Sequence, residues 1–264
     1  MQNKIKIGAL ISGGGTNLQA IIDACEQGKI DAEIEFVGSD NPEAKGIERA
    51  KKHHIPYFVV DYTQIIKYHQ NKPLPEDYNP TEIYEKQCIF SKSKKDQKKV
   101  IQLLNSRILA ERALLDQIYH YDFDLLVLAG FMRNLTPYFI DRINTDKDRP
   151  RIMNIHPALL PAFPGTDGYG DTFRYGCKVG GCTVHFIDYG EDSGPIIGQK
   201  CFSILPQDTE DCIRKKGLAL EWELYPECIQ LFAENRLKIQ VNQFKKNSLW
   251  KNRLKVEIEL SKRS

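Results

Sequence analysis

The feature that most constrains the fold is the alternation of strand and helix signals in the first 60 residues. A β-rich run at residues 4–11 is followed by three glycines, and apolar residues then recur at helical spacing from Leu18 to Cys25. The alternation continues with a strand at 34–37, a helix at 43–53 and a strand at 55–60. Strands that alternate with helices over short connections favour a right-handed, parallel α/β sheet.

The alternation is interrupted between residues 63 and 105. This stretch holds Pro73, Pro75 and Pro80 together with a lysine-rich run at 91–96, which is typical of a polar surface insertion with some helix of its own. Beyond it the sequence predicts a helix at 108–121, a buried central strand at 125–129, a helix at 137–143, a strand at 152–155, paired strands at 183–188 and 195–205, and a helix at 209–234.

These signals predict one α/β domain over residues 1–237, with the insertion inside it. We expect a Rossmann-like architecture, in which an open, mostly parallel, twisted sheet carries helices on both faces. Residues 238–264 are polar and alternating, so they predict a C-terminal extension. The pattern leaves two forms open for this extension, an added hairpin or a loose tail.

Composition narrows the class of protein. The chain has 37 Lys and Arg against 35 Asp and Glu, a net charge of +2 that is too balanced to indicate a nucleic-acid platform or a membrane surface. No apolar run approaches the roughly 18 residues of a membrane span, and the N-terminus lacks a signal-peptide pattern. Seven scattered cysteines without a CxxC pair predict neither a disulfide framework nor a zinc site. We therefore expect a cytoplasmic protein that binds neither nucleic acid nor a membrane. Small-molecule substrates are its expected partners, and the sequence leaves a monomer and a homodimer both open.

A glycine-rich loop separates the first strand from the first helix. It reads Ser12-Gly13-Gly14-Gly15-Thr16-Asn17-Leu18, and glycines before a helix N-terminus let backbone N–H groups approach an anion. Leu18 stands where a dinucleotide fingerprint would have its third glycine, and no Gly-Lys-Ser/Thr follows. The loop therefore predicts a phosphate site of another kind, and a merely tight turn is the alternative interpretation.

Two further motifs carry polar groups that can catalyse a reaction. Asn154 and His156 are two residues apart at the end of a strand, so both point into the crevice where open α/β sheets bind ligands. An amide beside an imidazole can stabilise an oxyanion and move a proton. Carboxylates follow at Asp188, Glu191 and Asp192, in a segment that is either a simple acidic turn or the source of a partner for His156.

The four segments at residues 11–22, 127–133, 153–161 and 183–186 together carry a family resemblance. They read ISGGGTNLQAII, VLAGFMR, MNIHPALLP and TVHF, and with them the chain resembles the glycinamide ribonucleotide formyltransferases, folate-dependent enzymes of purine synthesis. The resemblance runs from Lys4 to about Leu237, apart from the insertion. It implies transfer of a formyl group from the co-substrate 10-formyltetrahydrofolate to an amine, through a tetrahedral intermediate and without a metal.

The resemblance also implies roles for particular residues. Asn154, His156 and Asp192 match the catalytic trio of the family. Gly15, Thr16, Asn17 and Glu221 match its ribonucleotide contacts. The folate contacts correspond to Arg107, Met132, Arg133, Asn134 and Leu135, and to the loop residues Asp188, Tyr189, Gly190 and Glu191.

One segment departs from the family pattern. Where better-known members carry a histidine-containing helix start, residues 166–171 read Thr-Asp-Gly-Tyr-Gly-Asp, so any role of a histidine there is lost or passes to Asp167 or Tyr169. This departure bears on the rate and on the preference for an acceptor more than on the type of reaction.

Three other functions share part of this sequence pattern. A formyltetrahydrofolate deformylase would share the Asn, His and Asp, but its family carries an N-terminal regulatory domain, which we do not expect because the first strand begins at Lys4. A methionyl-tRNA formyltransferase has a C-terminal tRNA-binding domain, and only 27 residues follow Leu237 here. A non-catalytic module that binds a phosphate ligand would have no need of the Asn154, His156 and Asp192 set.

Overall fold

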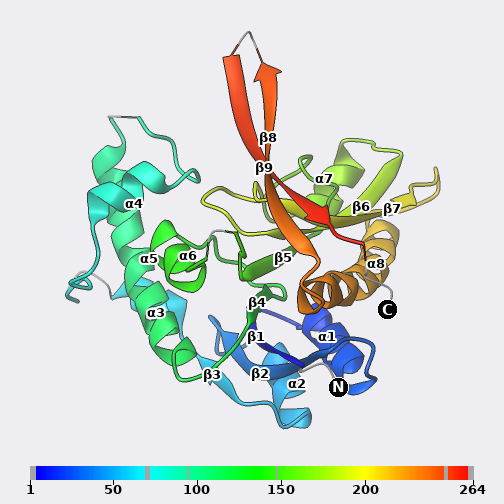
Figure 1. Cartoon of the computed structure of the whole chain (residues 1–264), viewed down its shortest axis with the longest axis horizontal. Helices are drawn as coiled ribbons and strands as arrows, with labels where there is room; N and C mark the ends of the chain where they lie inside the picture. The colour runs from blue at the N-terminus through cyan, green and yellow to red at the C-terminus, as the bar shows by residue number, and fades with distance from the viewer. Residues whose placement is uncertain (1–3, 69–71, 94, 147, 247–248, 261–264) are drawn as a thin grey trace.

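The molecule is built on a seven-stranded sheet in the order β3-β2-β1-β4-β5-β6-β7 (Figure 1). The computed structural model describes residues 4–68, 72–93, 95–146, 148–246 and 249–260. The strands of the sheet are β1 (Ile5–Ile11), β2 (Ala32–Ser39), β3 (Tyr57–Val59), β4 (Leu125–Leu128), β5 (Ile152–His156), β6 (Val179–Phe186) and β7 (Ile196–Ser203). The strands from β3 to β5 pair in parallel, whereas β6 and β7 are antiparallel. The predicted mostly parallel α/β sheet is therefore confirmed.

Helices cover both faces of this sheet. They are α1 (Thr16–Glu26), α2 (Gly46–Lys52), α3 (Tyr62–Lys67), α4 (Pro80–Lys86), α5 (Gln97–Ile118), α6 (Pro137–Ile143), α7 (Gly168–Arg174) and α8 (Glu210–Ala233). Buried side chains of α1, α2 and α8 form one core with the sheet, and those of α5 and α6 form a second core on the other face. Strand β1 separates the two, because Ile7 and Ala9 face the first core and Leu10 faces the second.

A close approach between neighbouring strands explains one glycine of β1. A Cβ atom on Gly8 would stand 2.2 Å from the ring of Phe36, which is fully buried in the second core. Only glycine leaves room for that ring beside the strand. The aromatic side chain therefore packs directly on the backbone of the central strand.

The helix predicted at 108–121 begins earlier than its sequence pattern indicated. α5 starts at Gln97, because Val100 and Leu104 are buried and extend the apolar face of the helix toward the N-terminus. The lysine-rich run at 91–96 obscured this continuation. The predicted insertion thus contains α3 from its second residue, α4 and the first part of α5, and its residues 69–71 and 94 lie outside the described part of the chain.

The insertion also contributes to the second core. Tyr78, Ile83 and Tyr84 are buried there. Tyr78 donates a hydrogen bond from its hydroxyl to Asn105 at 2.9 Å, which ties the segment before α4 to α5. A solvated surface insertion would not bury these side chains, so part of this segment belongs to the domain core.

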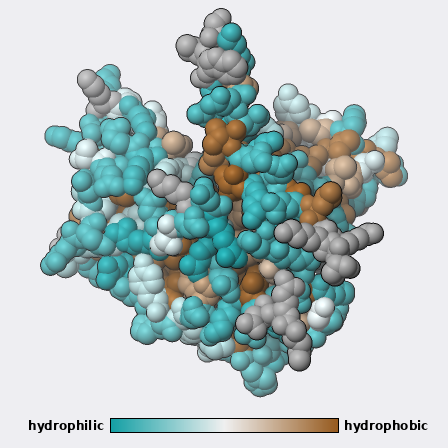
Figure 2. Space-filling model, in the orientation of Figure 1, coloured by the Kyte–Doolittle hydropathy of each residue, from teal (hydrophilic) through white to brown (hydrophobic). Residues whose placement is uncertain are grey.

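The C-terminal extension forms a hairpin of two antiparallel strands, β8 (Leu237–Lys246) and β9 (Leu249–Ile258). It projects from the body of the molecule in Figure 1. Ile239 and Val256 pack against the first core, while their neighbours Val241 and Leu254 are exposed, and apolar side chains gather along the lower part of the hairpin in Figure 2. Of the two forms left open by the sequence, the hairpin is the one observed, and residues 247–248 and 261–264 lie outside the described residues.

The strand order also locates a ligand crevice. The chain runs outward from β1 through β2 to β3 on one side, and from β4 to β5 on the other. In open α/β sheets, ligands bind at the carboxyl ends of the strands where the order reverses. That point lies between β1 and β4, so the residues that follow these two strands and β5 border the expected site.

Candidate active site

The glycine-rich loop turns directly into α1 and is held from behind by α2. Gly15 has φ +67° at the N-cap of α1, and a Cβ there would stand 2.8 Å from the Cα of Gly46. Gly46 donates its backbone N–H to the carbonyl of Gly13 at 2.9 Å, and Arg49 Nε donates to the carbonyl of Gly14 at 2.9 Å. These two hydrogen bonds hold the loop against α2. The first N–H groups of α1 have no partner within the helix, so they are available to an anion.

A cavity of about 350 Å³ opens in front of this loop. Glu221 reaches it from α8 and accepts hydrogen bonds from Asn17 Nδ2 at 2.7 Å and from the Tyr169 hydroxyl at 2.6 Å. Burial raises the pKa of Glu221, although both hydrogen bonds oppose that shift. The four residues Gly15, Thr16, Asn17 and Glu221 line one cavity although about 200 positions separate the loop from Glu221. We call it the acceptor cavity, after the ribonucleotide contacts that the family resemblance implies for these four residues.

The second group of site residues lies at the end of β5. His156 is buried, its Nδ1 lies 3.2 Å from Asp192 Oδ2, and its Nε2 donates to the carbonyl of Phe163 at 2.8 Å. Asp192 has φ +48° and also accepts the backbone N–H of Gly165 at 2.8 Å. A non-glycine residue with positive φ is uncommon, so the loop directs this carboxylate at His156 through a constrained backbone.

Asn154 is oriented by a histidine on the neighbouring strand. His185 is the cross-strand partner of Asn154, and the two side chains meet at 3.2 Å between Nδ2 of Asn154 and Nε2 of His185. His185 Nδ1 donates to the carbonyl of Phe186 at 2.9 Å, which leaves Nε2 as the acceptor. Burial lowers the pKa of His185, consistent with this neutral form. The sequence motif TVHF contained His185 but indicated no role for it.

A second cavity, of about 260 Å³, is lined by Asn154 and His156. We call it the donor cavity, after the folate contacts that the family resemblance implies. The predicted folate residues that line it are Arg107, Met132, Arg133, Asn134, Leu135, Asp188, Gly190 and Glu191, together with the trio Asn154, His156 and Asp192. The structure therefore brings all but one of the predicted folate contacts to one cavity.

Several of these residues hold one another in place. Arg107 Nη1 donates to the carbonyl of Asn134 at 3.4 Å, and Asn134 Nδ2 donates to Glu191 at 3.0 Å. Arg133 forms an ion pair of 2.5 Å with Asp40, which is buried. Arg133 therefore has a structural partner in addition to its place in the cavity lining.

Tyr189 is the one predicted folate residue outside the lining of the donor cavity. Its carbonyl accepts the backbone N–H of Cys88 at 2.8 Å, and its hydroxyl donates to Asp141. Lys86 forms an ion pair with the same Asp141 at 2.8 Å. Two residues of the insertion therefore contact the segment that carries Asp192, Cys88 directly and Lys86 through Asp141. These contacts join segments far apart in the sequence and have no local sequence signal.

The donor cavity also contains a buried carboxyl that the sequence did not indicate. Glu111, on α5, accepts the backbone N–H of Thr136 at 2.7 Å and the Thr136 hydroxyl at 2.5 Å. Burial raises the pKa of Glu111 to about 7, against the effect of these hydrogen bonds.

The segment that departs from the family pattern borders the acceptor cavity. Tyr169 donates to Glu221, as described above, and Asp167 pairs with Arg174 at 2.6 Å and with Arg214 at 2.5 Å. The hydrogen bonds from the two arginines lower the pKa of Asp167. Tyr169 therefore lines the acceptor cavity itself, whereas Asp167 is connected to it through Arg214.

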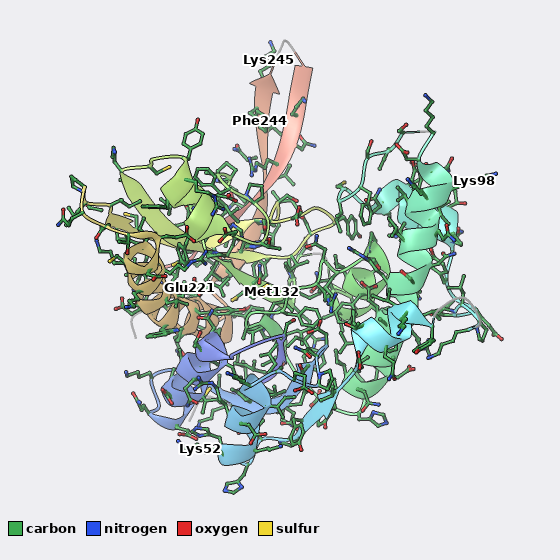
Figure 3. The ribbon with its side chains drawn as sticks, turned by 180° about the vertical axis from the view of Figure 1, so that it is seen from behind. Lys52, Lys98, Met132, Glu221, Phe244 and Lys245 are labelled. Carbon is green, nitrogen blue, oxygen red and sulfur yellow. The ribbon has the colours of Figure 1, made fainter. Side chains whose placement is uncertain are left out.

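The acceptor and donor cavities adjoin. They share the lining residues Gly130, Met132, Ile155, Pro157 and Thr166. In Figure 3, Glu221 on α8 and Met132 after β4 both lie near the middle of the molecule, far from the ends of α5 and of the hairpin. Two ligands bound side by side here would meet next to Asn154 and His156, which suits a transfer between them.

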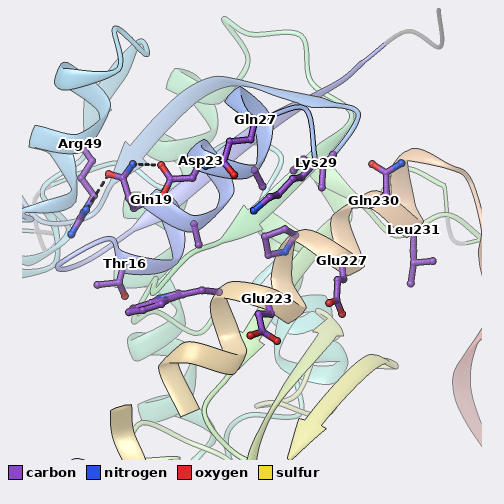
Figure 4. Close-up of a pocket in the computed structure, with 15 residues that line it drawn as sticks. Thr16, Gln19, Asp23, Gln27, Lys29, Arg49, Glu223, Glu227, Gln230 and Leu231 are labelled. Carbon is purple, nitrogen blue, oxygen red and sulfur yellow. Dashed lines mark hydrogen bonds between the residues drawn. The ribbon is translucent and has the colours of Figure 1, made fainter. Parts of the chain in front are cut away.

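A larger cavity, of about 910 Å³, lies between α1 and α8 and contains none of the trio (Figure 4). It shares Thr16 with the acceptor cavity, and Gln19 forms hydrogen bonds there with Arg49 and Asp23.

Over the described residues, no group of three or more His, Cys, Asp or Glu side chains is placed to hold a metal ion. Nor does any helix in the described ranges combine the length and the apolar character needed to cross a membrane.

Comparisons with known proteins identify the family of this chain. The formyl transferase family matches residues 5–229. Phosphoribosylglycinamide formyltransferase of Bacillus subtilis is 33% identical over 225 residues, which are 85% of this chain and 93% of the relative. The crystal structure of glycinamide ribonucleotide transformylase 1 from Symbiobacterium toebii has 33% identity and a TM-score of 0.68, covering 98% of this chain and 95% of that one. The corresponding Coxiella burnetii enzyme, in complex with CHES, has 32% identity and a TM-score of 0.69 over 94% and 95%. The chain therefore belongs to the formyl transferase family.

Proposed function

We propose that the chain transfers the formyl group of 10-formyltetrahydrofolate to the primary amine of 5'-phosphoribosylglycinamide, a step of de novo purine synthesis. The products are the formylated ribonucleotide and tetrahydrofolate. The observation that carries this proposal is the meeting of two cavities beside Asn154 and His156. One cavity begins at a helix N-terminus suited to a phosphate, and the other holds the residues that match a folate site.

The reaction begins when the acceptor amine attacks the formyl carbon. A carbon–nitrogen bond forms, the carbonyl oxygen becomes an oxyanion, and the bond to N10 of the folate then breaks. Asn154 has one amide hydrogen directed at His185, so the second is available to the oxyanion. A donor in this position typically contributes about 3–4 kcal/mol to the stabilisation of the transition state.

His156 and Asp192 complete the transfer of charge and protons. Nε2 of His156 donates to the Phe163 carbonyl in this structure. To stabilise the oxyanion, the same N–H leaves that carbonyl and donates to the substrate oxygen instead. Asp192 keeps the ring oriented through Nδ1 and assists movement of a proton from the attacking amine to N10. Binding both substrates in adjoining cavities lowers the entropic barrier of the reaction.

A steady-state assay with 10-formyltetrahydrofolate, with and without the ribonucleotide, tests this proposal. We expect tetrahydrofolate to form only when the ribonucleotide is present, with the formyl group recovered on its amine. Release of formate at the same rate without any amine would instead identify a deformylase. Binding of the ribonucleotide with no turnover in either arm would identify a non-catalytic binding module.

A further inference from the structure

The acceptor cavity contains a single cationic side chain among its described lining residues. That residue is Arg214, on the face of α8 that also presents Leu218 and Glu221 to the cavity. Positions 214, 218 and 221 follow the i, i+4, i+7 spacing of one helix face. At 1.5 Å per residue, Arg214 lies roughly 10 Å along the helix axis from Glu221.

The guanidinium of Arg214 is held in place but not saturated. Nη2 donates to Asp167 at 2.5 Å and to Glu210 at 2.7 Å, and Nε donates to the same Glu210 oxygen at 3.2 Å. Nη1 has no hydrogen-bond partner within the described ranges of the chain. The two carboxylates therefore fix the plane of the guanidinium and leave two N–H groups of Nη1 for a ligand.

Charge indicates which ligand those groups would take. A phosphate monoester carries nearly two negative charges at neutral pH, and the backbone N–H groups of the glycine loop supply only the partial charge of a helix end. The other ionisable side chains in the described lining, Glu221 and Tyr169, carry no positive charge. A planar guanidinium matches phosphate oxygens in geometry as well as in charge.

We propose that Arg214 binds the phosphate of the acceptor opposite the glycine loop and thereby selects phosphorylated acceptors. This inference rests on the proposed function for the identity of the acceptor. Asp167, in the segment that departs from the family pattern, serves to orient the guanidinium. The acceptor cavity would then recognise its ligand from two walls, with backbone N–H groups from α1 and the side chain of Arg214 from α8.

Arg174 provides a matched control. It pairs with Asp167 at 2.6 Å and lies 3.7 Å from Glu210, two carboxylates that Arg214 also contacts, but it is absent from the lining of the acceptor cavity. Both arginines are exposed enough for substitution without loss of the core, with side-chain exposures of 42% for Arg214 and 53% for Arg174. A loosened Asp167 segment would affect both variants, whereas loss of a phosphate contact affects only one.

The test measures KM for the ribonucleotide and for its dephosphorylated riboside in wild type, Arg214→Gln, Arg214→Lys and Arg174→Gln. We expect Arg214→Gln to raise KM for the ribonucleotide by about 10- to 100-fold, as for a charge-assisted hydrogen bond, and to leave kcat/KM for the riboside unchanged. Arg214→Lys should be intermediate, and Arg174→Gln should match wild type. Equal losses in Arg214→Gln and Arg174→Gln, or equal losses with both acceptors, would overturn the proposal.

Calorimetric titration with ribose 5-phosphate, and with ribose as its uncharged counterpart, separates this inference from the proposed function. Weaker binding of ribose 5-phosphate to Arg214→Gln, with binding to Arg174→Gln unchanged, supports the phosphate contact even if the wild-type protein does not formylate the ribonucleotide. Turnover by the wild-type protein together with unaltered ribose 5-phosphate binding in Arg214→Gln refutes the contact and leaves the proposed function intact.

Discussion

Asn154 Nδ2 and His185 Nε2 lie 3.2 Å apart across the pairing of β5 with β6. His185 Nδ1 donates to a backbone carbonyl, and burial lowers the pKa of His185 and so favours the neutral ring, in which Nε2 is the acceptor. This acceptor directs the NH2 group of the Asn154 amide, and not its oxygen, toward His185. An amide that flipped would present oxygen to the developing oxyanion. His185 is therefore a positioning residue for Asn154.

Replacing His185 should impair catalysis more than binding. We expect His185→Leu to lower kcat about 10- to 100-fold, because the Asn154 amide loses its orientation, while KM for both substrates changes by less than about threefold. Thermal unfolding of the same variant shows how much stability the substitution costs. A variant with wild-type kcat would show that Asn154 is oriented by other means.

The contact between the insertion and the Asp188–Asp192 loop gives a second prediction. Cys88→Pro removes the N–H that donates to the Tyr189 carbonyl, whereas Cys88→Ala retains it. We expect Cys88→Pro to raise KM for 10-formyltetrahydrofolate about two- to tenfold, with KM for the ribonucleotide unchanged, because one backbone hydrogen bond holds the loop at the donor cavity. Cys88→Ala should match wild type. Equal effects of the two variants on either KM would show that this hydrogen bond does not hold the Asp188–Asp192 loop in its position at the donor cavity.

Glu111 predicts a measurable dependence of stability on pH. Its pKa is raised from an ordinary value of 4.5 to about 7 in the folded protein, so the native state holds this proton more tightly than the unfolded state does. The folded state is therefore favoured below pH 4.5, and that advantage is lost as pH rises to 7, by about 3 kcal/mol.

Glu111→Gln removes this titration while keeping an acceptor for Thr136. Chemical unfolding at pH 5 and at pH 8.5 should show the free energy of unfolding of the variant gaining about 2.5 kcal/mol relative to wild type between the two values. Other titrating groups cancel in this comparison. A difference between the proteins that does not change with pH would contradict the raised pKa.

Local signals predicted much of the fold. The helix expected at 137–143 coincides with α6, because Pro137 stands at its first position and Thr136 caps it by accepting the N–H of Tyr138. The sequence pattern does not indicate the beginning of α5, because the lysine-rich, polar residues at 91–99 directly precede the buried Val100 and Leu104. Hydrophobic periodicity predicts a helix well where one face of the helix is plainly apolar. It fails where a run of polar residues interrupts the apolar positions.

The sequence indicates site residues through recognisable motifs or, for Arg107 and Glu221, only through the resemblance to the family. The glycine loop, Asn154 and His156 occupy such segments, and the structure places them around two adjoining cavities. The contributions of His185 and Arg214 depend on strand register and on the path of α8, which bring together residues far apart in sequence. Long-range packing of this kind leaves no local pattern to read.

The measurement that most directly tests the account is kcat for Asn154→Ala, His156→Ala and Asp192→Ala, with thermal unfolding and binding of both substrates measured on the same preparations. We predict that each variant folds and binds, and that kcat for formyl transfer falls by at least about 100-fold, the usual loss when one oxyanion donor or general acid–base group is removed. Near-wild-type kcat in all three variants would contradict the assignment of this trio as the catalytic centre.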